Sequence, residues 1–216
     1  MLLPVFEVLI EDSYAIRDLR TRLGSAPDLI IDLGAHVGSA AVAMGRSFPD
    51  AAIRCYEPSS AAVRWLRANL EGNNLRSEVF PVAVTDKSGV VPFWEESPGS
   101  CGNSVMESRS SKGRSGACIQ VESVSFDSVM ANVETPCLLK MDIEGSEYAI
   151  IAKSASMSWK SVVAVLLEYH SVDGSCGFQK ISRDLLDRGL VPLWHRANPE
   201  AENLGVALFV RSDGPF

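Results

Sequence analysis

Residues 29–60, LIIDLGAHVGSAAVAMGRSFPDAAIRCYEPSS, decide the fold of this 216-residue chain. An apolar run over 29–33 leads into a turn with two glycines, and a helix of small residues is predicted over 38–48. A second apolar run over 51–57 ends at Glu57. Runs that are apolar throughout are typical of strands buried on both faces of a parallel sheet. The stretch therefore predicts a strand, a crossover helix and a second strand.

Strand and helix patterns continue to alternate downstream. Further strands are predicted over 78–84, 89–94, 117–124, 137–142, 162–170, 190–195 and 205–210, with Pro81 marking an irregularity in the first of them. Further helices are predicted over 59–71, where Ser59 or Ser60 is the N-cap, from about 146, and over 177–188. This alternation indicates an α/β fold, a mostly parallel sheet with helices on both faces. Because no helix separates the two closing strands, we expect them to pair antiparallel at or near one edge.

No linker divides the chain, so we expect residues 1–216 to form a single domain. Residues 1–25 are interpreted as a helical cover on that domain. Residues 95–116 are rich in Ser and Gly and are interpreted as a mobile loop, which makes them a candidate substrate lid.

Composition excludes several classes of protein. The net charge of −7 and the pI of about 5.0 disfavour a nucleic-acid partner, which needs clustered Lys and Arg. No uncharged apolar stretch reaches about 18 residues, so no membrane span is predicted. The N-terminus lacks the basic region of a signal peptide, and we expect a cytoplasmic protein. The five cysteines form no CxxC pair, which disfavours a zinc site or a disulfide framework.

Polar side chains stand where the predicted strands end. Asp32, Glu57, Asp142, Glu168 and His170 each follow or close an apolar run. Ligands of open α/β sheets bind outside the carboxyl ends of the strands. Because a charge after a buried run is costly unless it faces a cleft, we expect these residues to surround a ligand site.

The turn DLGAHVGS, residues 32–39, predicts which ligand is bound. Gly34 allows a positive φ, Gly38 allows close packing, and free N–H groups at the helix start can hold a carboxylate or phosphate. The turn lacks the G-x-G-x-x-G fingerprint, which disfavours a dinucleotide. Glu57, at the end of the next strand, is placed to accept hydrogen bonds from two ribose hydroxyls. Together these features favour a nucleoside-containing ligand without a pyrophosphate.

These residues carry a family resemblance over about residues 29–210. DLGAHVGS (32–39), YEPS (56–59), ANLEGN (68–73), SVSFDSVM (123–130), KMDIEGSEYAII (140–151) and LLEYH (166–170) resemble, in order and spacing, the motifs of the FkbM family of S-adenosylmethionine-dependent methyltransferases. The resemblance implies the Rossmann-like class I methyltransferase fold, with a seven-stranded, mostly parallel sheet whose last strand is antiparallel.

The resemblance also implies S-adenosyl-L-methionine as cofactor and methyl transfer, an EC 2.1.1 activity, to a hydroxyl of a sugar or small natural product. The partner would then be a small hydroxylated acceptor; the sequence leaves the oligomeric state open. The residues we expect to bind the cofactor are Asp32, Gly34, Ala35, His36, Gly38, Ser39, Glu57, Pro58, Ser59, Ala83 and Asp142. The alternatives are an NAD-dependent oxidoreductase and an inactive module that binds S-adenosylmethionine.

A hydroxyl nucleophile gains from a general base. The candidates are Asp142, Glu144, Glu147, Glu168 and His170, of which Glu147 is interpreted as structural because it opens a helix. His170 has the most suitable ordinary pKa, about 6.5. We therefore predict His170, Asp142 and Glu144 as catalytic residues and no metal; a divalent cation held by Asp142 and Glu144 is the alternative.

Overall fold

The computed structural model describes residues 6–95, 103–105, 117–170, 177–198 and 201–212. Its main feature is a seven-stranded sheet of order β3-β2-β1-β7-β8-β10-β9. The strands of this sheet are β1 (Leu29–Leu33), β2 (Ala52–Tyr56), β3 (Ser77–Phe80), β7 (Cys137–Met141), β8 (Val162–His170), β9 (Leu190–Asn198) and β10 (Ala201–Arg211). The α/β class predicted from the sequence is therefore confirmed.

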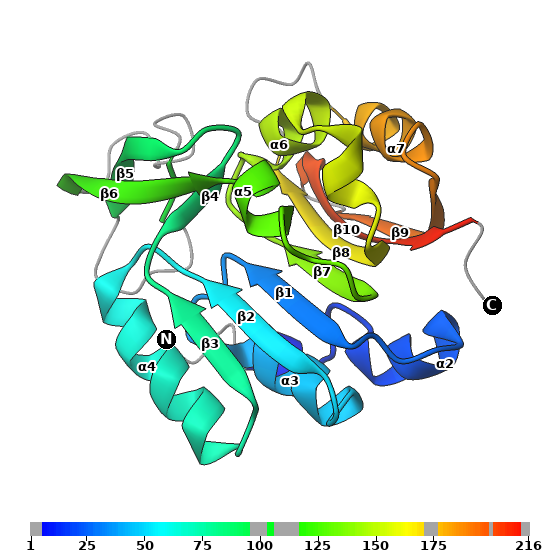
Figure 1. Ribbon diagram of the computed structural model, residues 1–216, viewed down its shortest axis with the longest axis horizontal. Helices are drawn as coiled ribbons and strands as arrows, with labels where there is room; N and C mark the ends of the chain where they lie inside the picture. Colours follow the sequence, from blue (N-terminus) through cyan, green and yellow to red (C-terminus); the bar gives the residue numbers. More distant parts are fainter. Residues whose placement is uncertain (1–5, 96–102, 106–116, 171–176, 199–200, 213–216) are drawn as a thin grey trace.

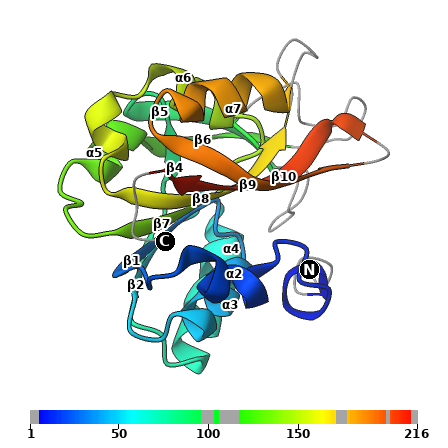
Figure 2. The same ribbon diagram turned by 90° about the vertical axis from the view of Figure 1, so that its right-hand side faces the viewer.

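Helices cover both faces of the sheet, as Figures 1 and 2 show. One face carries α2 (Leu19–Leu23), α3 (Ser39–Ser47) and α4 (Ser60–Gly72). The other carries α5 (Phe126–Met130), α6 (Glu147–Lys153), α7 (Phe178–Leu186) and the 3-10 turn η3 (Ser156–Trp159). None of the helices within the described ranges is long and apolar enough to cross a membrane.

Strand β1, which lies inside the sheet between β2 and β7, separates two apolar cores. Leu29, Ile31 and Leu33 pack on the face with α5, α6 and α7, whereas Ile30 packs on the face with α3 and α4. All five residues of β1 are buried, because alternate side chains point to opposite, covered faces. Asp32 shares the face of Ile30 and is a charge inside that core.

Strand β1 lies at the switch point of the sheet, where the chain stops adding strands on one side and begins adding them on the other. It pairs in parallel with β2 on one side and with β7 on the other. Leu33 is aligned with both Tyr56 and Met141, so the residues that follow these three strands leave the sheet at one edge. A crevice outside the carboxyl ends of the strands is expected at such a point.

The last strand is antiparallel, as predicted. β10 runs antiparallel to β8 and to β9 and lies between them. Gly205 in β10 leaves room for Tyr169 of β8, since a Cβ at residue 205 would lie 2.4 Å from the Tyr169 hydroxyl. That hydroxyl lies 2.9 Å from Nε2 of His195 in β9, which joins the outer strands across β10.

The single strand predicted over 78–84 is wrong, because the chain changes sheets there. β3 ends at Phe80, and residues 83–85 form β4 (Ala83–Thr85) in a second sheet. Pro81 has no N–H to continue the ladder, which explains the break. The second sheet, of order β4-β6-β5, also contains β5 (Gly89–Glu95) and β6 (Ala117–Ser125).

Residues 6–23 fold into short helical turns that lie against α3. They comprise η1 (Phe6–Ile10), the 3-10 turn η2 (Ile16–Asp18) and α2, and both η1 and η2 contact α3. Figure 2 shows this segment on the α3 side of the sheet. The backbone between the first two turns is unusual, because Asp12 and Ala15 have positive φ angles of 54° and 51°.

Candidate active site

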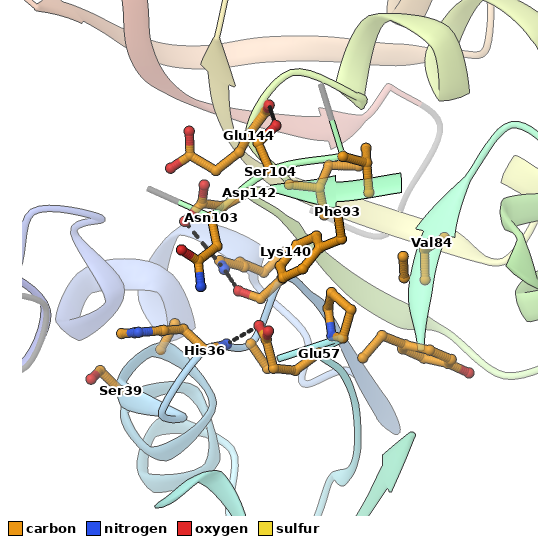
Figure 3. A pocket seen from close by; sticks show the side chains of 18 of the residues that line it. His36, Ser39, Glu57, Val84, Phe93, Asn103, Ser104, Lys140, Asp142 and Glu144 are labelled. Carbon is orange, nitrogen blue, oxygen red and sulfur yellow. Dashed lines mark hydrogen bonds and ion pairs between the residues drawn. The ribbon is translucent and has the colours of Figure 1, made fainter. Parts of the chain in front are cut away.

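A pocket opens at the carboxyl ends of β1, β2 and β7, where the switch point predicts one. Figure 3 shows Glu57 and His36 at one end of it and Asp142 and Glu144 at the other, with Lys140 between them. Of the residues predicted to bind the cofactor, those that line this pocket are Gly34, Ala35, His36, Ser39, Glu57, Pro58, Ala83 and Asp142.

Glu57 is buried and is held by backbone donors on both sides. Its Oε2 accepts the N–H of His36 at 2.8 Å, and its Oε1 accepts the N–H of Ser59 at 2.8 Å. Burial raises the pKa of Glu57 to about 7, although these two hydrogen bonds oppose the rise. Each carboxylate oxygen has a further lone pair and Glu57 lines the pocket, so the group can still accept hydrogen bonds from a ligand.

The start of α3 forms the neighbouring wall. The N–H of Ala35 donates to Tyr56 and that of Gly38 to Ala35, so these groups are already engaged within the turn. The first helical turn that follows has N–H groups with no intrahelical acceptor. Among the described residues none hydrogen-bonds the hydroxyl of Ser39, which is 8% exposed and lines the pocket. A polar ligand group is therefore expected beside Ser39.

Gly34 and Gly38 lie at positions where a side chain would not fit. Gly34 has a φ of 75°, and a Cβ there would lie 1.8 Å from the carbonyl oxygen of Asp142. The turn after β1 thus fits closely against the turn after β7. Gly38 has a φ of 87°, and its missing side chain makes room for Leu66 of α4. Gly38 therefore serves helix-on-helix packing rather than the pocket surface.

Lys140 links the first turn to the acidic end of the pocket. Its Nζ lies 3.1 Å from Asp32 Oδ1 and 3.5 Å from Asp142 Oδ2, and it donates to the carbonyl of Gly34 at 2.8 Å. Asp32 and Lys140 are aligned partners on adjacent strands. Burial alone would lower the pKa of Lys140, but the two carboxylates raise it, so the ammonium stays charged. Asp32 lies behind this ammonium and does not line the pocket.

Tyr14 is a pocket residue that the sequence analysis did not identify. It is 6% exposed, and its hydroxyl lies 3.1 Å from Asp142 Oδ2 and 2.5 Å from Glu168 Oε2. Burial raises the pKa of Glu168 to about 7, and the charge of Asp142 adds to the rise. Burial would also raise the pKa of Asp142, but Lys140 and other neighbours lower it.

His170 has surroundings that change its chemistry. Its Nδ1 lies 3.1 Å from Glu147, and its Nε2 lies 3.6 Å from both Glu144 and Glu168. Burial alone would lower the pKa of His170, but the carboxylates of Glu147, Glu144 and Asp142 raise it to about 10. The imidazole is then protonated at neutral pH and does not line the pocket. These findings do not favour the predicted role of His170 as a general base, which relied on its ordinary pKa.

Glu147 acts within the structure, as its position at the start of α6 indicated. It is fully buried, and its two oxygens accept the N–H groups of Ile143 and Gly145 at 3.0 and 2.8 Å. These bonds hold the turn that carries Glu144, which has a φ of 54°. The carbonyl of Glu144 accepts the hydroxyl of Ser104 at 2.7 Å. Glu144 lines the pocket as a result of this support.

Possible metal ligands cluster near the acidic end. Ligand atoms of Asp142, Glu168 and His170 lie within 4.8 Å of one another. These side chains already have partners, since the Tyr14 hydroxyl lies within hydrogen-bond distance of both carboxylates and Glu147 lies 3.1 Å from the imidazole Nδ1. We therefore assign no metal to the cluster.

The second sheet contributes an apolar wall that the sequence analysis found only in part. Ala83 was predicted to line the pocket; Val84 and Phe93, which join it there, were not. Residues 103–105 also line the pocket, whereas the rest of the predicted lid, apart from Glu95, lies outside the described residues. Ser59 is the N-cap of α4, yet its hydroxyl donates to Glu95 at 2.9 Å and lies away from the pocket lining.

Comparison with known proteins gives a consistent result. Residues 32–187 match the family described as the methyltransferase FkbM domain. The 31-O-demethyl-FK506 methyltransferase FkbM of Streptomyces tacrolimicus is 23% identical over 198 residues, which cover 79% of this chain and 75% of that protein.

Two solved structures share the fold. An O-methyltransferase from Bacillus cereus in complex with SAH is 11% identical, with a TM-score of 0.53, and the match covers 94% of this chain and 81% of that one. The cofactor-bound Rv0187 from MTB is 10% identical, with a TM-score of 0.53, and the match covers 95% and 81%. At these identities the likeness concerns the fold alone.

Proposed function

Because the chain belongs to the FkbM family of S-adenosylmethionine-dependent methyltransferases, we propose that it methylates a hydroxyl oxygen of a small acceptor, such as a sugar or natural product. The cofactor supplies a methyl group bound to a positively charged sulfur. The relative from Streptomyces tacrolimicus is named for an O-demethylated substrate, which supports oxygen as the receiving atom.

Three parts of the pocket would hold this cofactor. The buried hydroxyl of Ser39 and the first turn of α3 would hold the methionine carboxylate. Glu57 would accept hydrogen bonds from the ribose hydroxyls. The apolar side chains of Ala83, Val84 and Phe93 would contact the adenine ring.

The acidic end of the pocket suits the chemistry of transfer. Asp142 and Glu144 line it, while Asp32, Glu147 and Glu168 lie behind. These carboxylates outnumber the cations beside them, Lys140 and His170, so the site would favour a positively charged sulfur. A hydroxyl placed beside Asp142 or Glu144 would donate its hydrogen bond to a carboxylate, which orients the oxygen and receives its proton. His170, when protonated, would orient Glu144.

The observation that carries the proposal is the placement of carboxylates at both ends of the pocket. Glu57, which would bind the ribose hydroxyls, lies at one end, and Asp142 and Glu144 lie at the other, with Lys140 between them. One end of the pocket has groups for a nucleoside, and the other has acceptors for a hydroxyl proton.

A direct experiment tests the proposal. The protein is incubated with S-adenosylmethionine and paired acceptors that differ only in a hydroxyl or an amine, and products are analysed by mass spectrometry. We expect a gain of one methyl group on hydroxylated acceptors. Methylation of the amines alone would refute oxygen as the target. In parallel, S-adenosylhomocysteine at 100 times its Kd should stabilise the fold by about 2.7 kcal/mol, whereas NAD should not.

A further inference from the structure

The N-terminal segment reaches into the site from outside the family domain, which matches residues 32–187. Val8 and Tyr14 both line the pocket. Tyr14 is 6% exposed although it lies on a short connection between two turns, where side chains are ordinarily solvated.

The backbone around Tyr14 is constrained to this position. Asp12 and Ala15, on either side, have positive φ angles, which cost free energy in residues other than glycine. Asp12 compensates by accepting the N–H groups of Ile16 and Arg17 at 2.7 and 3.2 Å. The guanidinium of Arg17 in turn donates to the carbonyls of Leu9 and Ile10. The segment is therefore built as a rigid turn that directs one phenol into the pocket.

The phenol lies between two carboxylates and has one proton to share. Its oxygen is 2.5 Å from Glu168 and 3.1 Å from Asp142, both hydrogen-bond distances. One O–H can donate to only one of these acceptors at a time. The contact with the other carboxylate becomes a hydrogen bond only when Tyr14, Asp142 and Glu168 together hold a second proton. Asp142 itself lines the pocket, so that proton can come from a molecule bound there.

We propose that Tyr14 is a positioning residue of the methyl-transfer centre, which joins Asp142 and Glu168 into one acceptor for the proton released by the hydroxyl substrate. The proposal rests on the proposed function. As the new O–C bond forms and the S–C bond breaks, the hydroxyl proton passes to Asp142. Asp142 then donates to the Tyr14 oxygen while the Tyr14 proton passes to Glu168. The products are a methyl ether, a neutral thioether and a protonated Glu168, so charge and atoms balance.

The charges around Tyr14, Asp142 and Glu168 favour proton transfer from Asp142 toward Glu168. Lys140 on β7 contacts Asp142, and His170 on β8 contacts Glu168. Behind them, Asp32 on β1 contacts Lys140, and Glu147 of α6 and Glu144 of the preceding turn contact His170. Lys140 lies against Asp142 and keeps that carboxylate ionised, so a proton that arrives there is passed on. Arg196, aligned with Glu168 through Val206, is exposed and lies over Trp194.

The test compares Tyr14→Phe with Tyr169→Phe. Tyr169 is a matched control, because it is also a buried tyrosine and its hydroxyl bonds His195 on the opposite face of the sheet. For Tyr14→Phe we expect kcat to fall by 10²-fold or more, an effect typical of losing a proton acceptor. The Kd for S-adenosylhomocysteine should change less than three-fold, roughly, and the pH dependence of kcat near neutral pH should shift. Tyr169→Phe should keep the kcat and pH profile of the wild type.

A second readout needs no substrate. Without the phenol proton, ionised Asp142 and Glu168 face each other, so the melting temperature of Tyr14→Phe should fall further below wild type at pH 8, roughly, than at pH 5. Tyr169→Phe should show the same deficit at both. An unchanged kcat and pH profile in Tyr14→Phe, or a pH-independent deficit, would overturn the proposal. If the wild type binds S-adenosylhomocysteine but methylates no hydroxyl, the proposed function fails, while the stability measurement still decides the role of Tyr14.

Discussion

Replacement of Glu57 by Gln should remove a pH-dependent loss of stability and, separately, weaken cofactor binding. Glu57 is 6% exposed, and its pKa is raised from 4.5 to about 7, mainly by burial. A shift of that size corresponds to about 3 kcal/mol. The sign follows from linkage: an acid whose pKa is higher in the folded state weakens the fold as pH rises from the unfolded to the folded pKa. Wild-type protein should therefore lose about 3 kcal/mol of stability through Glu57 between about pH 4.5 and 8.

Gln has no charge to bury, so the variant should not show this loss. Its amide nitrogen would instead face one of the two backbone donors, His36 or Ser59, and forfeit that hydrogen bond. We expect Glu57→Gln to be less stable than wild type at about pH 4.5, by about 1–3 kcal/mol, and the difference to vanish or reverse by about pH 8. Cofactor affinity should fall at least tenfold, because a charge-assisted bond is worth about 1.5–3 kcal/mol.

Two measurements check this expectation. Urea unfolding across the pH range gives the stability, and calorimetric titration with S-adenosylhomocysteine gives the Kd. Glu71→Gln, an exposed carboxylate on α4, is the control and should change neither. Parallel stability curves for wild type and Glu57→Gln would refute the burial argument. An unchanged Kd would refute the ribose assignment.

Other substitutions test the remaining contacts. Gly34→Ala places a Cβ 1.8 Å from the Asp142 carbonyl and should lower the free energy of unfolding in urea by at least about 3 kcal/mol. Gly72→Ala, with open space around it, is the control and should change that free energy very little. Equal losses in the two variants would contradict the close fit at Gly34. Lys140→Met leaves buried carboxylates without their cation and should cost about 3–5 kcal/mol at neutral pH but less in acid, where they are protonated; a pH-independent cost would argue against the ion pairs. Ser39→Ala should weaken S-adenosylhomocysteine binding about five- to tenfold without loss of stability; an unchanged Kd would place the methionine carboxylate elsewhere.

The sequence predicts the sheet well because its signals are local. Apolar runs over 29–33 and 137–142 correspond closely to β1 and β7, and the missing helix before the last strand explains the antiparallel pairing of β10. The change of sheets after Phe80 was not predicted, since the pattern over 78–84 is equally apolar on both sides of Pro81. The resulting second sheet brings Phe93 to the pocket, which no local motif marks.

The chemistry of the site was harder to predict, because it depends on contacts between distant residues. The pKa of His170 is set by carboxylates at the start of α6, so its ordinary value is a poor guide. Tyr14 belongs to a segment that was interpreted only as a helical cover, and its contact with Glu168 spans 154 positions. Burial of Asp32 behind Lys140 follows from strand register, which sequence alone does not give.

The close fit of the two turns also bears on how the protein is made. The contact from Lys140 to the carbonyl of Gly34 spans 106 positions, so on the ribosome the first turn emerges long before its partner. Until then Asp32 is a carboxylate without the cation of Lys140, and strand β1 lacks its partner β7 on one side. A nascent chain that ends before β7 should therefore neither bury Asp32 nor hold cofactor. Translation would complete the binding site late, once residues 137–144 have left the exit tunnel.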